Sequence, residues 1–255
     1  MRRALRVEWM KVRRAPVVLT TGALLVVLLP LLVVAFYELA LSDRPGAAAL
    51  KARAIVVGDG WDAYLGLAGQ LLAVGMFLGP GIVASWSFGR EFADRTFPSL
   101  FALPVSRQSI AGAKLVVLAG WGVAVAVLAT LVVVAAGALA GAGSLGAGEL
   151  WAGAGRLLVA SVLSSAIATT SGLAASIGRG YLPAVGAVIL LVAAAQVAVL
   201  FGAGGWFPYA SPGLLAVGGA DGVPHVTVPQ VLLVPVTVGL AGWATVRWWG
   251  STEVS

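Results

Sequence analysis

Few residues in this sequence have the types and spacing that enzyme chemistry requires. His225 is the only histidine and the chain has no cysteine, so one chain cannot assemble a histidine metal site, a thiolate metal site or a Ser-His triad. No glycine is followed by lysine, which rules out the phosphate-binding pattern G-x-x-x-x-G-K-S/T. We therefore expect no catalytic residue, no metal and no cofactor bound by this chain.

One segment, residues 89–108, combines charges with large apolar side chains. Its charged residues carry both signs and lie among Phe92, Phe97, Leu100 and Leu103. Exposed aromatic side chains beside paired charges are typical of a surface that docks a partner protein. The alternative is that these aromatic side chains lie among lipid headgroups.

A few polar side chains interrupt the apolar stretches of the sequence. Gln70 and Gln196 would each bury an amide, which costs about 1 to 3 kcal/mol when unpaired, so each should face protein or a cavity rather than lipid. Ser161, Ser165 and Thr169 are spaced by four and form one stripe on a helix. Such a stripe either lines a substrate path or permits close helix packing, which is the more frequent use.

Six long apolar stretches must position these residues. The 255 residues include 16 Lys or Arg and 10 Asp or Glu, so about 10% are charged, where a soluble domain has about 25%. A hydrocarbon core roughly 30 Å thick is crossed by about 20 residues of helix, and six charge-free stretches are long enough. We predict one all-α, polytopic membrane domain, 1–255, with spans at 17–36, 65–88, 115–139, 157–177, 182–201 and 231–246.

The basic residues are divided unevenly between the two sets of connections. With both termini on one side, 12 of the 16 Lys and Arg residues fall on that side. Because Lys and Arg favour the cytoplasmic side, we expect both termini in the cytoplasm and the protein in the cell membrane. Nucleic acid is not an expected partner, since the basic residues lie between apolar runs.

Residues 1–16 have the pattern of a basic amphipathic helix. At 100° per residue, one face holds Met1, Leu5, Trp9 and Val12, and the arginines lie on the other side. We expect this helix to lie along the cytoplasmic membrane surface and to end where Pro16 turns the chain into the bilayer. An ordinary positive flank that only orients the first span is the alternative.

Two further segments are rich in glycine and proline. Gly79, Pro80 and Gly81 can kink the second span, and we predict a hinge there, although prolines in other spans can have the same effect. Residues 202–230 contain four prolines and seven glycines. We expect them to re-enter the outer leaflet, covered by protein or beside water, with a plain extracellular loop as the alternative.

The sequence resembles the ABC-2 family, the membrane subunits of ATP-binding-cassette exporters. The resemblance rests on Phe88-Gly89-Arg90-Glu91-Phe92, Thr96, Leu100 and Leu103-Pro104-Val105-Ser106-Arg107, with Lys114 opening the next span. It extends to the six spans, the N-terminal helix and the segment before the last span. Arg95 departs from the pattern, since many members have glycine before the threonine.

The resemblance implies that residues 89–108 form a cytoplasmic coupling helix, which seats in a groove of a separate ATPase subunit. Its ATPase-coupling residues would be Arg90, Glu91, Phe92, Thr96, Phe97, Leu100, Leu103, Pro104 and Arg107. The implied partners are two ATPase chains, which bind ATP and Mg, a second copy of this chain or a similar permease, and membrane lipid.

The sequence therefore favours the transmembrane subunit of an ATP-driven exporter. Nearly charge-free spans fit an amphipathic or hydrophobic substrate, such as a drug, an antimicrobial peptide or a lipid-linked molecule, better than an ion path. An ATP-independent channel or secondary carrier is the alternative, although no pair of intramembrane carboxylates supplies a proton relay. An intramembrane enzyme would need an acid, base or metal cluster that the sequence does not provide.

Overall fold

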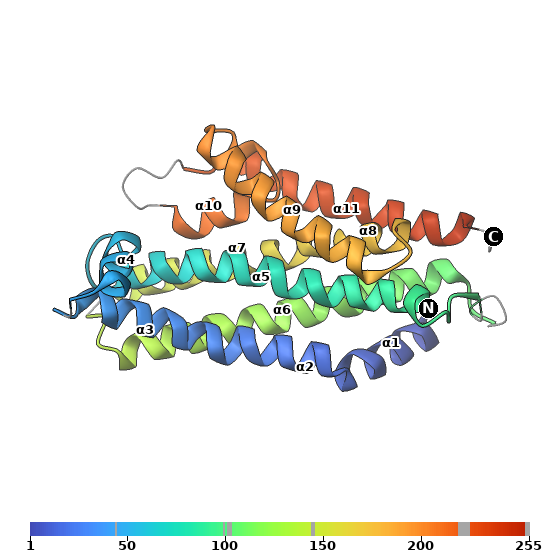
Figure 1. Ribbon diagram of the computed structural model, residues 1–255, viewed down its shortest axis with the longest axis horizontal. Coiled ribbons are helices and arrows are strands. Elements are labelled where there is room, and N and C mark those ends of the chain that lie inside the picture. The colour runs from blue at the N-terminus through green and yellow to red at the C-terminus, as the bar shows by residue number, and fades with distance from the viewer. Residues whose placement is uncertain (44, 99, 101–103, 144–145, 219–224, 253–255) are drawn as a thin grey trace.

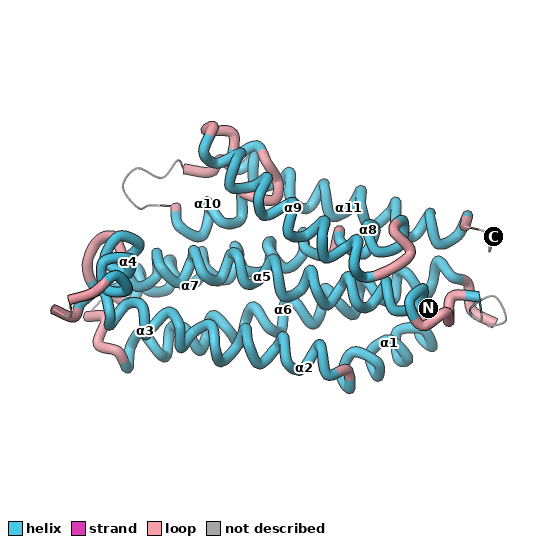
Figure 2. The backbone as a smooth tube through the Cα atoms, viewed as in Figure 1, coloured by secondary structure: helices cyan, strands magenta, loops and turns pink. Residues whose placement is uncertain are grey.

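The computed structural model describes the whole chain except residues 44, 99, 101–103, 144–145, 219–224 and 253–255. Every long element of the described part is a helix (Figures 1 and 2). Six of the helical stretches are long and apolar enough to cross a membrane: Pro16–Leu41, Gly60–Ala93, Arg107–Leu139, Gly148–Ile177, Tyr181–Leu200 and Val228–Ser251. The prediction of an all-helical protein with six candidate spans is confirmed.

The first span is a continuous helical path in three parts. They are α2 (Pro16–Ala23), a π-helical turn η1 (Leu24–Leu28) and α3 (Leu29–Leu41). Pro30 has no N–H to donate to the carbonyl one turn earlier, and the wider π turn lies directly before it. Before the span, α1 (Arg2–Arg14) ends at Ala15, whose extended backbone separates it from α2.

A short helix, α4 (Ala47–Ile55), lies in the connection after the first span and packs against α3. This helix is not among the elements expected from the sequence. Three consecutive alanines open α4, and alanine has the highest intrinsic helix propensity. The alanine run therefore forms a helix at the end of the bundle where the first and second spans are joined (Figure 1).

Helix α5 (Gly60–Ala93) lies at the centre of the bundle (Figure 1). Its 34 residues reach about 51 Å at 1.5 Å per residue, and they pack against α3, α7, α8, α9 and α10. Glycine permits two of these close approaches. A Cβ added at Gly89 would lie 2.4 Å from the backbone nitrogen of Tyr181, and one at Gly69 would lie 2.8 Å from the carbonyl oxygen of Ala216.

The remaining helices surround α5. Helix α6 (Arg107–Leu139) is followed by α7 (Ala147–Ala168), α8 (Ser171–Ile177) and α9 (Tyr181–Leu200). The expected fourth span is thus divided into α7 and α8 by a break at Thr169 and Thr170. The hydroxyl of each threonine donates to the carbonyl three residues earlier, so both side chains support this tight turn.

The described part of residues 202–230 folds back onto the bundle. It contains the 3₁₀ turn η3 (Gly204–Trp206) and α10 (Ser211–Val217), and α10 packs against α5 and α7. Helix α11 (Val228–Ser251) then starts at a capping box formed by Thr227 and Gln230. Ala216 contacts α5 at Gly69, more than two turns from the start of that helix. That residues 202–230 re-enter the outer leaflet of a bilayer stays a prediction.

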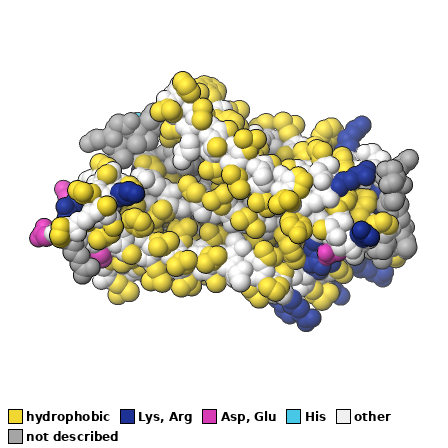
Figure 3. Space-filling view, viewed as in Figure 1, with side chains coloured by type: hydrophobic (Ala, Val, Ile, Leu, Met, Phe, Trp, Pro, Cys, Tyr) yellow, Lys and Arg dark blue, Asp and Glu magenta, His cyan; other side chains and the backbone are white. Residues whose placement is uncertain are grey.

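The two ends of the bundle differ in charge. Both termini lie at one end, called here the α1 end, and α4 lies at the opposite end, called the α4 end (Figure 1). Most visible Lys and Arg side chains gather at the α1 end, and most visible Asp and Glu side chains lie at the α4 end (Figure 3). This distribution is the one that the positive-inside rule associates with a cytoplasmic α1 end.

Candidate functional site

A buried ionic network joins α1, α5 and α6 near the α1 end. The Lys114 ammonium donates to Glu91 Oε1 at 2.9 Å, to Glu8 Oε2 at 3.0 Å and to the Ser87 carbonyl oxygen at 2.9 Å. All three N–H groups of this lysine are therefore used. The exposed fraction of the side chain is 1% for Lys114, 4% for Glu8 and 5% for Glu91, so these charges interact away from water.

Lys11 of α1 completes this network. Its ammonium donates to Glu8 Oε1 at 2.8 Å and to Glu91 Oε1 at 3.1 Å. Two ammonium groups therefore face two carboxylates, and the buried charges balance. Burial disfavours the charged form of Lys11, but its hydrogen bond to Glu8 and the attraction of both carboxylates outweigh burial, so the pKa of Lys11 is raised.

The network determines which face of α1 packs on the bundle. From the sequence pattern, the expected apolar face of this helix holds Met1, Leu5, Trp9 and Val12. The structure instead buries Ala4 and Glu8 beside Val12, while Trp9 is 48% exposed and Met1 is 55% exposed, so the expected face is wrong in part. The reason is electrostatic: a lysine as buried as Lys114 needs carboxylates around it, and Glu8 supplies one only when its face turns inward.

The turn after α5 holds Glu91 from its other side. Thr96 donates its hydroxyl to Glu91 Oε2 at 2.8 Å, and the Phe97 backbone N–H donates to the Glu91 carbonyl oxygen at 2.7 Å. Arg95, between them, has a φ of 55°, in the left-handed region that favours glycine. The arginine thus adopts the backbone conformation that glycine adopts readily, and the turn closes despite the departure from the family pattern.

The aromatic residues of this turn are packed inside the protein. Phe92 stacks on Phe97 with ring centroids 4.5 Å apart, and Phe97 meets the Trp249 ring of α11 edge to face at 5.4 Å. Trp249 in turn donates its indole N–H to the Ser176 hydroxyl of α8 at 2.9 Å. The expectation of exposed side chains is wrong for Phe97 and Leu100, which are 6% and 8% exposed, because both belong to one buried apolar cluster with Trp249. Leu103 lies outside the described residues.

The other residues assigned to coupling lie around this cluster. Arg90 lies over the Trp86 ring at 4.8 Å and pairs with Asp94 at 3.8 Å, while Pro104 is exposed. Arg107, the first residue of α6, donates to the Gly250 carbonyl oxygen at 3.2 Å and to the Thr252 carbonyl oxygen. The α5–α6 connection is therefore joined to α1, α6 and α11 at the α1 end, and Trp249 of α11 joins it to α8.

The predicted hinge lies in the middle of α5 and is buried. Pro80 stands within the helix, and the Gly81 carbonyl oxygen accepts hydrogen bonds from the hydroxyls of Ser85 at 2.7 Å and Ser171 at 3.0 Å. Ser171 is the first residue of α8, directly after the break in the fourth span. The irregular positions of α5 and of the α7–α8 span are therefore hydrogen-bonded to each other.

Two of the predicted polar residues line the same cavity, called here the larger cavity. It has a volume of about 520 Å³ and is lined by residues of α4, α5, α7, α9 and α10 and of the segment before α10. Gln70 and Gln196 lie in its wall together with Ser164, Tyr209 and apolar side chains. Both glutamines are exposed in the single chain, so the expectation that their amides face protein or a cavity rather than lipid stays a prediction.

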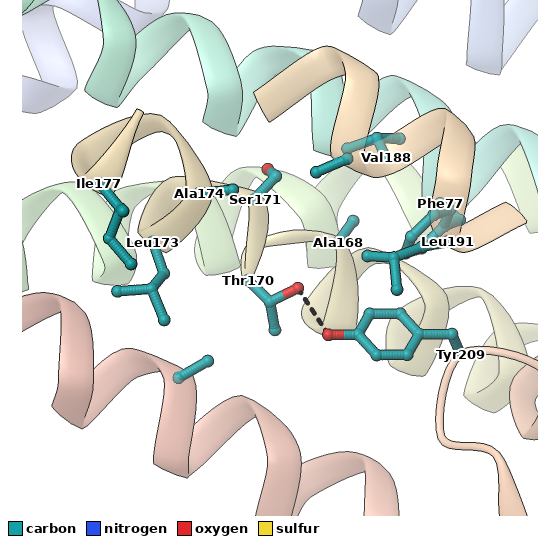
Figure 4. A pocket seen from close by; sticks show the side chains of 12 residues that line it. Phe77, Ala168, Thr170, Ser171, Leu173, Ala174, Ile177, Val188, Leu191 and Tyr209 are labelled. Carbon is teal, nitrogen blue, oxygen red and sulfur yellow. Dashed lines mark hydrogen bonds between the residues drawn. The ribbon is translucent and has the colours of Figure 1, made fainter. Parts of the chain in front are cut away.

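A smaller cavity of about 270 Å³ lies at the break between α7 and α8 (Figure 4). Its lining residues on α8 reach Ile177, and those on α9 are Ala187, Val188 and Leu191. Ile177 and Ala187 lie on the side of this cavity that faces the α1 end. The Tyr209 ring enters it from the segment before α10, with its hydroxyl 3.2 Å from the Thr170 hydroxyl. The sequence analysis singles out neither residue.

The hydroxyl stripe of the fourth span lines neither of the two cavities. Ser161, Ser165 and Thr169 are buried, and none of the three lines either cavity. A Cβ added at Gly122 of α6 would lie 2.0 Å from the Ser165 hydroxyl oxygen, so α6 and α7 approach closely at this serine. These contacts support the packing interpretation of the stripe.

Comparisons with known proteins agree with the resemblance seen in the sequence. A family model described as "ABC-2 family transporter protein" matches residues 4–196, which is more than half of the 255-residue chain. The matched range begins in α1 and ends in α9, so it includes the ionic network and the α5–α6 connection. The comparison with curated proteins gives no match.

Proposed function

Because the chain belongs to the ABC-2 family of transporter proteins, we propose that it is the membrane subunit of an ATP-driven exporter for amphipathic or hydrophobic molecules. Membrane permeases of this family have no ATPase site of their own and generally pair with an ABC ATPase. A group of three or more potential metal ligands is likewise not found among the described residues. The energy for transport then comes from ATP and Mg bound to the partner.

The observation that carries the proposal is the ionic network at the α5–α6 connection. Glu91 lies in the last turn of α5, and its carboxylate accepts hydrogen bonds from Lys114 of α6 and from Lys11 of α1. The next residues bind α11 through Phe97 and Arg107. A partner that moves residues 89–108 therefore displaces several helices together, which is the property a coupling segment needs.

This observation changes the role that we propose for individual residues of the segment. Glu91, Phe97 and Leu100 are buried, so they act by holding the segment in shape rather than by touching the ATPase. Exposed positions such as Asp94, Thr96 and Pro104 are then the ones that contact the ATPase groove. The segment thus has an inner, positioning side and an outer, docking side.

We further propose that two copies of this chain assemble with two ATPase chains, with the α1 end in the cytoplasm. The charge difference between the two ends supports this orientation. The return of α10 onto α5 and α7 supports a re-entrant segment at the outer side. The amides of Gln70 and Gln196 in a largely apolar cavity support a substrate that has both apolar surface and hydrogen-bonding groups.

Purification of the chain with its associated proteins tests the proposal. We expect an ABC ATPase to co-purify and to hydrolyse ATP in a vanadate-sensitive manner. Glu91→Ala and Arg107→Ala should lower ATP-driven transport and ATPase association, while Asp62→Asn, at an exposed carboxylate in the first turn of α5, serves as a control for surface charge. Wild-type insertion, association and transport in both alanine variants would refute the coupling role. Transport that persists without ATP would instead support a channel or secondary carrier.

A further inference from the structure

The two cavities lie end to end along the bundle and share two wall residues. Along α9, the smaller cavity touches Ala187, Val188 and Leu191, and the larger cavity continues from Val192 to Val199. Along α5, Phe77 lines both cavities, and residues toward the α4 end line only the larger one. Tyr209 is the second residue common to both. The wall between the cavities is therefore made by Phe77 and Tyr209.

These two aromatic rings contact each other across the wall. Their centroids are 5.8 Å apart and their planes are inclined by 82°, a favourable edge-to-face arrangement. Phe77 comes from α5 and Tyr209 from the segment before α10, so two separate parts of the fold must stay in register to keep the wall closed. Phe77 is 6% exposed.

A hydrogen bond fixes the tyrosine side of this wall. The Thr170 hydroxyl has one proton, which it donates to the Ile167 carbonyl oxygen at 2.8 Å. In its 3.2 Å contact with Tyr209, Thr170 is therefore the acceptor and the tyrosine hydroxyl is the donor (Figure 4). Loss of that single proton donor frees the Tyr209 ring to leave the break between α7 and α8.

We propose that Phe77 and Tyr209 form a gate on the substrate path, which separates the smaller cavity from the larger one and opens when Tyr209 leaves Thr170. This inference rests on the proposed transport function. Tyr209 lies beyond residues 4–196, so the family match assigns it no role.

The gate is connected to the predicted hinge. Thr170 holds Tyr209, and the next residue, Ser171, donates to the carbonyl oxygen of Gly81. Phe77 lies one helical turn before Gly81 on α5, three residues from Pro80. A change of bend at Pro80 therefore moves Phe77 and the break that holds Tyr209 at the same time, and it acts on both sides of the gate.

The chemistry of the walls defines the class of molecule that passes. Among the described residues that line either cavity, none is Lys, Arg, Asp, Glu or His. The polar side chains are uncharged amides and hydroxyls, from Gln70, Gln196, Ser164, Thr170, Ser171 and Tyr209. An ion would lose its hydration here without compensation, whereas an uncharged amphipathic molecule can bury apolar surface and still form hydrogen bonds.

Cysteine labelling tests the gate directly, because the native chain has no cysteine. Ala187→Cys reports on the smaller cavity and Gln196→Cys on the larger one, and both positions lie on α9. The probe is an uncharged, sugar-linked methanethiosulfonate that does not cross membranes, added to the α4 side of sealed vesicles that contain the full-length chain. With the gate intact, we expect rapid modification at position 196 and slow modification at position 187.

Conservative substitutions then open the gate. Tyr209→Phe and Thr170→Val should each raise the labelling rate at position 187 about fivefold, which corresponds to loss of a net hydrogen bond of about 1 kcal/mol. The double variant should show no further rise, since both changes remove the same bond. Phe77→Ala should raise the rate more, and Tyr181→Phe, which removes a tyrosine hydroxyl away from both cavities, should leave it unchanged.

The outcomes separate this inference from the proposed function. Equal labelling at position 187 in the parent, Tyr209→Phe and Thr170→Val proteins would overturn the gate, as would equally fast labelling at positions 187 and 196 in the parent. ATPase co-purification, measured on the same membranes, reports on the proposed function alone. A shift in labelling without any associated ATPase would support the gate and contradict the ATP-driven exporter.

Discussion

Glu8→Gln is the substitution that tests the ionic network most directly, because it removes one buried charge and keeps the size of the side chain. Glu8 Oε2 lies 3.0 Å from the Lys114 ammonium. At that distance the attraction is about 5 to 6 kcal/mol for an effective dielectric constant near 20. The glutamine still accepts a hydrogen bond, and it costs less than a carboxylate to remove from water. We therefore expect the free energy of unfolding to fall by about 3 kcal/mol, which is the lower end of the range for a broken buried ion pair.

Equilibrium unfolding of the purified chain in mild detergent, followed by helical circular dichroism, measures this loss. Asp94→Asn is the matched control, since it makes the same change from carboxylate to amide at a side chain that is 56% exposed and 3.8 Å from its partner. For such a surface pair we expect at most about 0.5 kcal/mol. Faster tryptic cleavage within α1 should accompany Glu8→Gln, because the helix loses its main polar contact with α6.

A second substitution tests whether the loss of stability in Glu8→Gln comes from unbalanced buried charge. Lys114→Met alone leaves Glu8 and Glu91 buried with only Lys11 between them, and should be as costly as Glu8→Gln. The double variant restores one carboxylate and one ammonium, so its cost should fall short of the sum by about 1 to 3 kcal/mol. Simple additivity of the two costs, or a loss below about 0.5 kcal/mol for Glu8→Gln, would refute the argument from charge balance.

Three further predictions follow from the packing. Arg95→Gly should stabilise the turn after α5 by about 1 kcal/mol, because glycine adopts its φ of 55° without a steric penalty, as measured by the same unfolding assay. Gly69→Ala should destabilise the protein by about 1 to 3 kcal/mol, since its Cβ would lie 2.8 Å from the Ala216 carbonyl oxygen, while Gly66→Ala, with open space around it, should be neutral or stabilising. Gln196→Leu should lower transport of a polar amphipathic substrate but leave ATPase association unchanged, and an unaltered transport rate would exclude this amide from the path.

The sequence predicts the spans well because each one is a long, uninterrupted run of apolar residues along the chain. Each apolar stretch must exceed about 20 residues, and only charge positions are needed to recognise it. The helix in residues 47–55 is missed because it is short and contains Lys51 and Arg53, so it has no apolar run long enough to cross a membrane. Local propensity alone would have identified it.

The candidate site is only partly visible in the sequence. Glu91 lies in the sequence pattern that resembles the ABC-2 family. Glu8 lies in no such pattern, and its partner Lys114 is 106 residues away. The one signal for it is a carboxylate among six basic residues in 1–14, which a buried lysine elsewhere in the chain could require. Tyr209 and Thr170 give no signal either, because a hydroxyl pair across 39 residues depends on how α10 returns to the bundle.

The buried network, the hinge and the gate lie on one helix, and their order along it gives a physical reason for a rigid connection between them. Glu91 is at one end of α5, Pro80 and Gly81 are near the middle, and Phe77 is one turn farther. From residue 81 to residue 91 the helix has no proline, and Gly89 is packed against the Tyr181 backbone, so a displacement of the helix end is transmitted over about 15 Å. Pro80 removes one backbone hydrogen bond at the point where the rigid part ends, which makes the bend there easier than anywhere else along α5. A force applied at Glu91 therefore changes the angle at Pro80, and Phe77, directly beyond that bend, is the side chain whose position relative to Tyr209 changes most.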